Sequence, residues 1–446
     1  MSVPANETVE TLVVNREVST ALKKLKQNLK ILEKQVGAEK IVDWYRRLGK
    51  MSLAIKYLEK IQPKEKNISV LLARIYNILG YPHLAEKIFQ SFKKETAQDH
   101  LYFAEFCLSI YKYDDAITSY LKFFSIKEKT YDHEYRLALF GLADSYAGIN
   151  DFDIANKLVN EALLYSQENI MQAIGYSCLG EYQARQTNHK AGLQYFEKSL
   201  SLMPSGEAFG DLGLLYKWQA VCLAHLGFND TAEDLFFLAI NLIKEAGYRS
   251  DGWLAILFER HNAGLGTWQE FARLCHYPGT TKTFGQKFKV EKVPLNLGDS
   301  KNAKIVIDLS ASEFKVDDRI KFGLSKDLTC LAYLRIGENW GISYSSIISQ
   351  LWSDEPHDIF SLEKRLEQLF TRIKNKYGLV IYTKHRVAYL HESCLKQISV
   401  LAGGPSLPSL LRKQKNGVTI KDIENYYNVS STTAKRLYKK WNLSDS

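Results

Sequence analysis

Basic side chains recur at helical spacing between residues 358 and 378. One face of this segment is polar or basic, with Ser361, Lys364, Arg365, Gln368 and Arg372. The opposite face is apolar, with Leu362, Leu366, Leu369, Phe370 and Ile373. Arginine can donate two hydrogen bonds to the edge of a guanine, and lysine can neutralise a phosphate. The spacing therefore predicts an amphipathic helix whose polar face is suited to nucleic acid, although a solvated surface helix has the same pattern.

The net charge is concentrated in the same part of the chain. Residues 300–446 contain 23 Lys and Arg against 15 Asp and Glu, a net charge of +8, whereas the remaining residues contain 36 against 35. The full chain of 446 residues is 46% hydrophobic and 24% charged, which is typical of globular proteins. Its length predicts about two to four domains. A basic module joined to a nearly neutral one favours a polyanionic partner for the basic part.

Several kinds of chemistry have no signal in this sequence. The six cysteines are isolated, without a Cys-x-x-Cys pair or neighbouring histidines, which argues against a zinc site or a disulfide framework. No Gly-rich phosphate loop or metal-ligand cluster is present. The N-terminus lacks a signal-peptide pattern, and no apolar run is long enough to span a membrane. We therefore expect a cytoplasmic protein that is not an enzyme, has no metal or other cofactor and does not enter a membrane.

A periodic pattern fills the first two thirds of the chain. A small residue recurs at intervals of 31, 31, 39, 37 and 40 residues, at Ala54, Ala85, Ala116, Ala155, Gly192 and Ala232. Four residues after each stands a bulky residue, namely Leu58, Phe89, Tyr120, Val159, Phe196 and Phe236. Twelve residues before each stand Val42, Ala73, Ala104, Ala143, Gly180 and Ala220. Small residues let two helices approach closely and the bulky residue fills the groove to the next pair, so the period predicts stacked helix pairs.

This pattern resembles the tetratricopeptide repeat, most fully in HKAGLQYFEKSLSLMP at residues 189–204. The resemblance implies six repeats over residues 38–247 and a concave face that holds a peptide, a partner helix or a second protomer. We expect the array to extend to residue 277 with an irregular final helix pair. Residues 1–37 are expected to form a capping helix, with dimerisation as its alternative use. The sequence does not identify the ligand of the array.

The pattern changes after residues 278–303, a segment rich in Gly, Pro, Lys and Asn that is predicted to be a linker. Two runs rich in β-branched residues follow, and then three helical stretches. Residues 380–391 alternate like a hairpin, with Lys384, His385 and Arg386 at its tip. This order predicts an α+β domain over residues 304–395.

The domain at residues 304–395 resembles the OmpR-type winged helix of bacterial response regulators, in LSKDLTCLAYL at 324–334, in ISYSSIISQLW at 342–352 and in its long third helix. The resemblance implies that the third helix enters the major groove of double-stranded DNA and that the hairpin lies over the minor groove or phosphates. By position it assigns DNA contacts to Ser361, Lys364, Arg365, Gln368, Arg372, Lys376, Lys384, His385 and Arg386. Glu363 and Glu367 would repel phosphate unless they accept a hydrogen bond from cytosine.

Residues 405–446 are a third candidate module. Within it, TIKDIENYYNVSSTTAKRLY at residues 419–438 resembles the helix-turn-helix of lac-repressor-type regulators. Asn428 stands at a turn position that favours a positive φ, and Ser430 is a good N-cap. The resemblance implies DNA contacts by Ser431, Thr432, Thr433, Lys435, Arg436, Lys439 and Lys440. A structural or protein-binding tail of three helices is the alternative.

As a whole, the sequence predicts a mainly α protein, with a tetratricopeptide-type α-solenoid, an α+β winged-helix domain and a small trihelical helix-turn-helix. The resemblances imply a bacterial, sequence-specific DNA-binding transcriptional regulator, whose array binds a protein or peptide partner or a second protomer in a homodimer. Two alternatives are an interaction scaffold whose winged helices bind protein and a non-catalytic accessory factor of DNA recombination.

Overall fold

A computed structural model describes residues 5–402 with short gaps and a few residues beyond them. The gaps are at residues 15–17, 49–50, 62–65, 204–208, 247–251, 279–287, 289–294, 299–301, 311, 317–318 and 353–358. Beyond residue 402 the described residues are Ile420, Lys421, Ser431, Thr432 and Lys435. The chain divides into two compact units, Met1–Leu265 and Gly266–Ser446, and each is described by itself.

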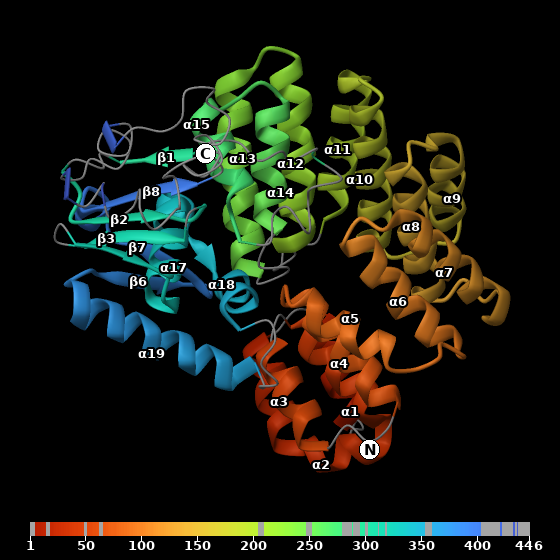
Figure 1. Ribbon diagram of the computed structural model, residues 1–446. Helices are drawn as coiled ribbons and strands as arrows, with labels where there is room; N and C mark the ends of the chain where they lie inside the picture. Colours follow the sequence, from red (N-terminus) through yellow and green to blue (C-terminus); the bar gives the residue numbers. More distant parts are fainter. Residues whose placement is uncertain are drawn as a thin grey trace. The chain divides into compact units, whose positions relative to one another are not determined.

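The first unit is an array of α-helices (Figure 1). In its described residues the helices are α1 (Ala5–Val14), α2 (Val18–Arg47), α3 (Met51–Ile61), α4 (Lys66–Ile78), α5 (Pro82–Gln90), α6 (Ala97–Ser109), α7 (Tyr113–Ile126), α8 (His133–Gly148), α9 (Phe152–Leu164), α10 (Asn169–Arg185), α11 (His189–Leu202), α12 (Phe209–His225), α13 (Asn229–Ala246) and α14 (Gly252–Asn262). Consecutive helices pack as the pairs α4–α5, α6–α7, α8–α9, α10–α11 and α12–α13. The predicted array of helix pairs is therefore present.

The small and bulky repeat positions lie in the interior of this array. The fully buried members are Ala54, Ala85, Ala116, Ala155, Ala232, Leu58, Val159, Phe196 and Phe236. The reason for a small residue is clear at Gly180, where an added Cβ atom would lie 2.5 Å from the ring of Phe196. The ring occupies the space that a side chain would fill, so this close approach agrees with the predicted register at Gly180 and Phe196.

The N-terminal segment differs from the single capping helix that we predicted. α1 packs on α2, and α2 consists of two helical parts that meet at Gly37, whose backbone is not helical and has a φ of +76°. Glu10 of α1 accepts a hydrogen bond from Nε1 of Trp44 at 2.6 Å and forms an ion pair with Lys40 at 2.9 Å. The kink at Gly37 coincides with the boundary predicted after residue 37, but the segment before it contains two helices, α1 and the first part of α2, instead of one.

The last predicted helix pair of the array is divided between the two units. α14 belongs to the first unit, whereas α15 (Trp268–Cys275) belongs to the second. Arg273 of α15 forms an ion pair with Glu338, and the hydroxyl of Tyr277 donates to the carbonyl of Gly337 at 3.2 Å. These polar contacts attach α15 to the second unit, so the division falls after residue 265 instead of after residue 277.

The second unit contains, in its described residues, a five-stranded sheet in the order β1-β8-β2-β3-β4. Its strands are β1 (Leu295–Leu297), β2 (Ile305–Asp308), β3 (Glu313–Val316), β4 (Arg319–Phe322) and β8 (Ile398–Ala402). β8 runs parallel to β2 and antiparallel to β1. β1 lies in the predicted linker, and β8 lies beyond the predicted domain end at residue 395. Both strands are short and pair with residues distant in the sequence, so neither leaves a local pattern.

Three helices and a second sheet complete the described part of this unit. The helices are α17 (Lys326–Gly337), α18 (Tyr344–Leu351) and α19 (Ile359–Tyr377). The one-turn η1 (Glu338–Trp340) directly follows α17, and the short α20 (Glu392–Leu395) precedes β8. The sheet has the order β5-β7-β6, from β5 (Ile342–Ser343), β7 (Val387–Leu390) and β6 (Ile381–Lys384). Ser325 and Ser343 cap α17 and α18 by accepting hydrogen bonds from backbone N–H groups. Among the helices that the structure describes, none combines the length and apolar character needed to cross a membrane.

Candidate nucleic-acid interface

α19 separates apolar from polar side chains. Its buried residues are Ile359, Leu362, Leu366, Leu369, Phe370 and Ile373. Its exposed predicted contact residues are Ser361, Lys364, Gln368, Arg372 and Lys376, whereas Arg365 is half-buried. Because Ser361, Lys364 and Gln368 are three or four residues apart, they lie along one open strip of the helix. This strip combines a hydroxyl, an ammonium group and an amide, which together can donate and accept hydrogen bonds.

The hairpin β6–β7 turns at His385 and Arg386. Both residues have a positive φ, +51° for His385 and +60° for Arg386, at a two-residue turn that usually contains Asn-Gly. Lys384 and His385 are exposed, and Arg386 forms an ion pair with Glu363 near the start of α19. The ion pair brings the hairpin tip beside the N-terminal half of α19. The predicted helix and hairpin contact residues are therefore neighbours in this part of the second unit.

Asp327 is a buried carboxylate at the start of α17. It accepts hydrogen bonds from Nε and Nη2 of Arg372 at 2.8 and 2.5 Å, and Nζ of Lys376 lies 3.7 Å away. The Asp327 side chain is 7% exposed, whereas those of Arg372 and Lys376 are 58% and 56% exposed. The hydrogen bonds to Asp327 raise the pKa of Arg372 further. The sequence assigned Arg372 and Lys376 to DNA alone, but in the structure a carboxylate already pairs with both.

Arg365 lies against an aromatic ring. Its guanidinium carbon is 5.5 Å from the ring centroid of Trp352, and Nζ of Lys326 is 5.1 Å from the same ring. Trp352 is 6% exposed, so this stacking connects the start of α17, the end of α18 and α19. A cation over a desolvated indole is stabilised electrostatically. The half-buried Arg365 thus has a packing role that its helical spacing did not reveal.

The terminal module lies almost wholly outside the described residues. Of its predicted contacts, Ser431, Thr432 and Lys435 are described individually and are exposed. The remaining predicted contacts, Thr433, Arg436, Lys439 and Lys440, lie outside the described residues. Their contacts with DNA stay a prediction from the sequence.

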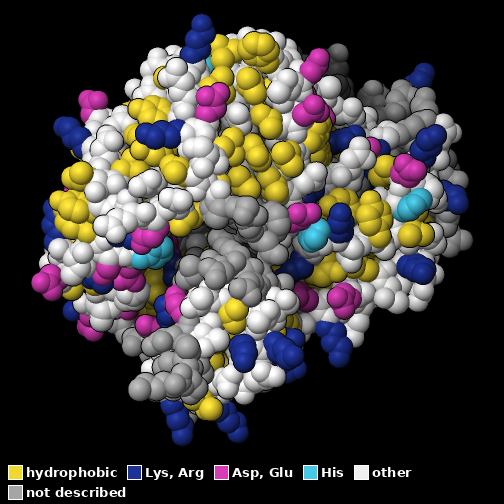
Figure 2. Space-filling model, turned by 180° about the vertical axis from the view of Figure 1, so that it is seen from behind, with side chains coloured by type: hydrophobic (Ala, Val, Ile, Leu, Met, Phe, Trp, Pro, Cys, Tyr) yellow, Lys and Arg dark blue, Asp and Glu magenta, His cyan; other side chains and the backbone are white. Residues whose placement is uncertain are grey.

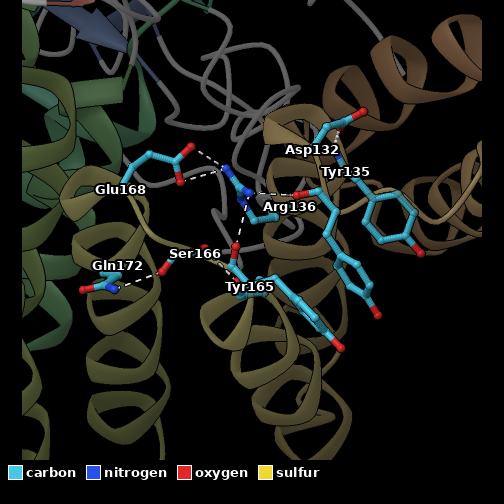
Figure 3. Close-up of polar contacts among 9 residues, drawn as sticks. Asp132, Tyr135, Arg136, Tyr165, Ser166, Glu168 and Gln172 are labelled. Atoms are coloured by element: carbon cyan, nitrogen blue, oxygen red, sulfur yellow. Dashed lines mark hydrogen bonds and ion pairs between the residues drawn. The ribbon is translucent and has the colours of Figure 1, made fainter.

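The first unit has a polar cluster that sequence reasoning missed, centred on Arg136 of α8 (Figure 3). Its Nη1 donates to the carbonyls of Tyr131 and Tyr165 at 2.7 and 3.2 Å, and its Nη2 donates to both carboxylate oxygens of Glu168 at 2.6 and 2.8 Å. The rings of Tyr131 and Tyr165 stack with centroids 3.7 Å apart. Tyr131 precedes α8 and Tyr165 follows α9, so one arginine fixes two loops of the long repeats after Ala116.

Charged side chains also recur along the first helices of the repeats. Arg74, Glu105, Asp144 and Glu181 each follow directly after a small repeat position. Nε and Nη2 of Arg74 donate to Glu105 at 2.8 and 2.9 Å. Burial and, secondarily, the Glu181 carboxylate raise the pKa of Asp144 to about 7, and the Tyr182 hydroxyl donates to Asp144 at 2.7 Å. Their fixed offset from the small residues is the sequence signal that could have identified them.

Apolar side chains are also exposed on the surface of the molecule (Figure 2). The most exposed large apolar side chains of the first unit are Leu164 at 76% and Phe228 at 58%. On α13, Phe237 and Leu238 are 41% and 42% exposed. Scattered apolar residues are ordinary on protein surfaces, but several on one array are compatible with a protein partner.

Comparisons with known proteins do not assign this chain to a family. No family model matches the chain, and no curated protein matches it. One similar solved structure is described as "Functional Characterization of Pseudomonas Aeruginosa pilF"; the alignment covers 46% of this chain and 93% of that chain, with 14% sequence identity and a TM-score of 0.31. A superposition this loose carries no conclusion about fold or function.

Proposed function

We propose that the chain is a sequence-specific DNA-binding transcriptional regulator, whose second unit contacts the duplex through α19 and the β6–β7 hairpin. One observation carries the proposal. The exposed strip of Ser361, Lys364 and Gln368 lies on α19, and the ion pair between Arg386 and Glu363 holds the hairpin tip beside the same helix. An α-helix with its side chains is about 10–12 Å wide and the major groove is about 12 Å wide, so a helix with one open polar face suits the groove. No catalytic activity forms part of this proposal.

The order of elements in the second unit supports the winged-helix interpretation. Strands precede α17, the short β5 lies between α17 and α18, and the β6–β7 hairpin follows α19. β5 pairs with β7, so the hairpin joins a sheet together with the strand between the first two helices. In this interpretation α19 reads base edges while Lys384 and His385 contact the backbone or the minor groove. The terminal residues Ser431, Thr432 and Lys435 would add a second contact.

The first unit would supply the regulatory input. Its stacked helix pairs and its exposed apolar side chains favour a protein, a peptide or a second protomer as partner. The second candidate function is an interaction scaffold without DNA binding. The ion pairs that Arg372, Lys376 and Arg386 already form with carboxylates favour that alternative, because they lower the net positive charge of the surface.

Selection from a randomised duplex library with the purified full chain tests the proposal. We expect enrichment of one sequence motif, and binding that weakens as the salt concentration rises. Lys364→Gln should reduce affinity for the selected and for random DNA. Lys190→Gln, at an exposed lysine of the array, is the matched control and should leave both affinities unchanged. If no duplex is enriched and no salt-dependent binding is seen, the scaffold function replaces the DNA-binding one.

A further inference from the structure

A buried carboxylate, that of Asp327, lies beside cations of the surface that we propose for DNA binding. Asp327 lies in the first turn of α17 and pairs with the two cations of the C-terminal half of α19, Arg372 and Lys376. A buried acid beside the phosphate-facing side of a helix repels the polyanion. An apolar or neutral residue there would leave both cations without a carboxylate partner, and their charge would then strengthen binding to any duplex.

The charges of this cluster show what Asp327 changes. Arg372, Lys376 and Asp327 together carry a net charge of +1, whereas the two cations alone carry +2. Nε and Nη2 of Arg372 both point to Oδ1 of Asp327, and this fixes the plane of the guanidinium group. The side chain remains 58% exposed, so it is held in place without being removed from the surface.

We propose that Asp327 is a specificity-determining residue of the DNA-binding surface, which acts by positioning Arg372 and Lys376 and by restraining their contact with phosphates. Base recognition is thereby left to Ser361, Lys364 and Gln368 in the N-terminal half of α19. This inference rests on the proposed function. A second cation of the predicted surface is also paired with a carboxylate, because Arg386 at the hairpin tip forms an ion pair with Glu363.

The test compares Asp327→Asn with the natural chain by measuring affinity against salt concentration, for random DNA and for the selected duplex. We expect the variant to bind random DNA more tightly and its log–log salt slope to steepen by about 0.9 for each additional phosphate contact. The ratio of selected to random affinity should fall. Asp308→Asn, at a buried aspartate of β2, is the matched control and should change neither quantity.

Distinct results separate this inference from the proposed function. If the natural chain binds no DNA, the proposed function is wrong, and the inference that rests on it is wrong as well. If the natural chain binds DNA selectively but a folded Asp327→Asn variant has the same slope and selectivity, the proposed function stands and the inference is overturned.

A triple variant keeps the test decisive if Asp327→Asn does not fold. Asp327→Asn, Arg372→Gln and Lys376→Gln together remove all three charges and leave neutral partners that can hydrogen-bond. If Asp327 restrains the cations, the salt slope should flatten by about 0.9 or less, since only one net charge is lost. A loss of about 1.8 would mean that both cations contact phosphates fully in the natural chain, and the inference would be wrong.

Discussion

Three arginines, Arg136 and Arg260 in the first unit and Arg372 in the second, differ in exposure although each is paired with a carboxylate. In the array, Arg136 and Arg260 have side chains 10% exposed, and each donates two hydrogen bonds to a glutamate of another element. In the second unit, Arg372 donates two hydrogen bonds to Asp327 and remains 58% exposed. The buried guanidinium groups of Arg136 and Arg260 are shielded from a ligand and serve to join elements of the array. The exposed guanidinium of Arg372 can still exchange its carboxylate partner for a phosphate, so the exposure of the arginine and not the residue type separates the two roles.

The largest expected effect is on the stability of the array. Arg136→Ala should lower the free energy of unfolding by about 2 to 3 kcal/mol, because two loop carbonyls and Glu168 lose their donor. Glu168 is 49% exposed and can be hydrated, which keeps the loss below that of a fully buried pair. Denaturant unfolding measures the change. Lys129→Ala, at a lysine that is 60% exposed, should leave the midpoint of unfolding nearly unchanged. Equal effects of the two changes would remove the contrast between buried and exposed pairs.

The next effect tests whether the interior of the array is closed to larger side chains. Ala155→Leu adds volume at a fully buried position of α9 and should cost about 1 to 3 kcal/mol through overpacking. Lys157→Leu makes a similar side chain at an exposed position of the same helix and should be nearly neutral. Thermal unfolding of both variants gives the comparison. A tolerated leucine at residue 155 would show that the repeat register is wrong.

The contrast between the units also explains what the sequence could predict. The repeat register recurs along the chain, and the two faces of α19 depend on residues three or four positions apart, so periodicity alone revealed both. The Arg372–Asp327 pair joins residues 45 positions apart, and the Arg136–Glu168 pair joins residues 32 apart. No local pattern marks such pairs. The sequence therefore predicted which side chains face outward on α19 but not which of them are already paired.

Strands β1 and β8 were missed for the same reason. Leu295 of β1 pairs with Ala402 of β8, which is distant in the sequence. The three residues of β1 are also too few to show the alternation that predicts a strand. The predicted linker and the predicted domain end consequently cut across paired strands. For the candidate site, the sequence predicted the surface, and the structure added the ion pairs with Asp327 and Glu363 that lower its positive charge.

A smaller effect concerns pH and the array alone. Burial and, secondarily, the Glu181 carboxylate raise the pKa of Asp144 from 3.8 to about 7, so the folded state binds its proton more tightly than the unfolded state does. The array should therefore gain stability as the pH falls from about 8 to about 6, by about 1 kcal/mol from this group. Unfolding at both pH values, for the natural chain and for Asp144→Asn, isolates the contribution. If the variant shows the same pH dependence as the natural chain, Asp144 does not titrate in this range.

The smallest expected change in stability is at the hairpin tip, where an exposed cation should matter for binding and hardly for folding. Lys384 is exposed at the end of β6, so Lys384→Gln should change the free energy of unfolding by less than about 0.5 kcal/mol. If Lys384 contacts a phosphate, the log–log salt slope for DNA should flatten by about 0.9. Lys396→Gln is the matched control, because Lys396 is an exposed lysine of the same unit between α20 and β8. The two variants should be equally stable and should differ only in their salt slope. If both flatten the slope alike, the second unit attracts DNA by its overall charge, and the hairpin has no specific place in the interface.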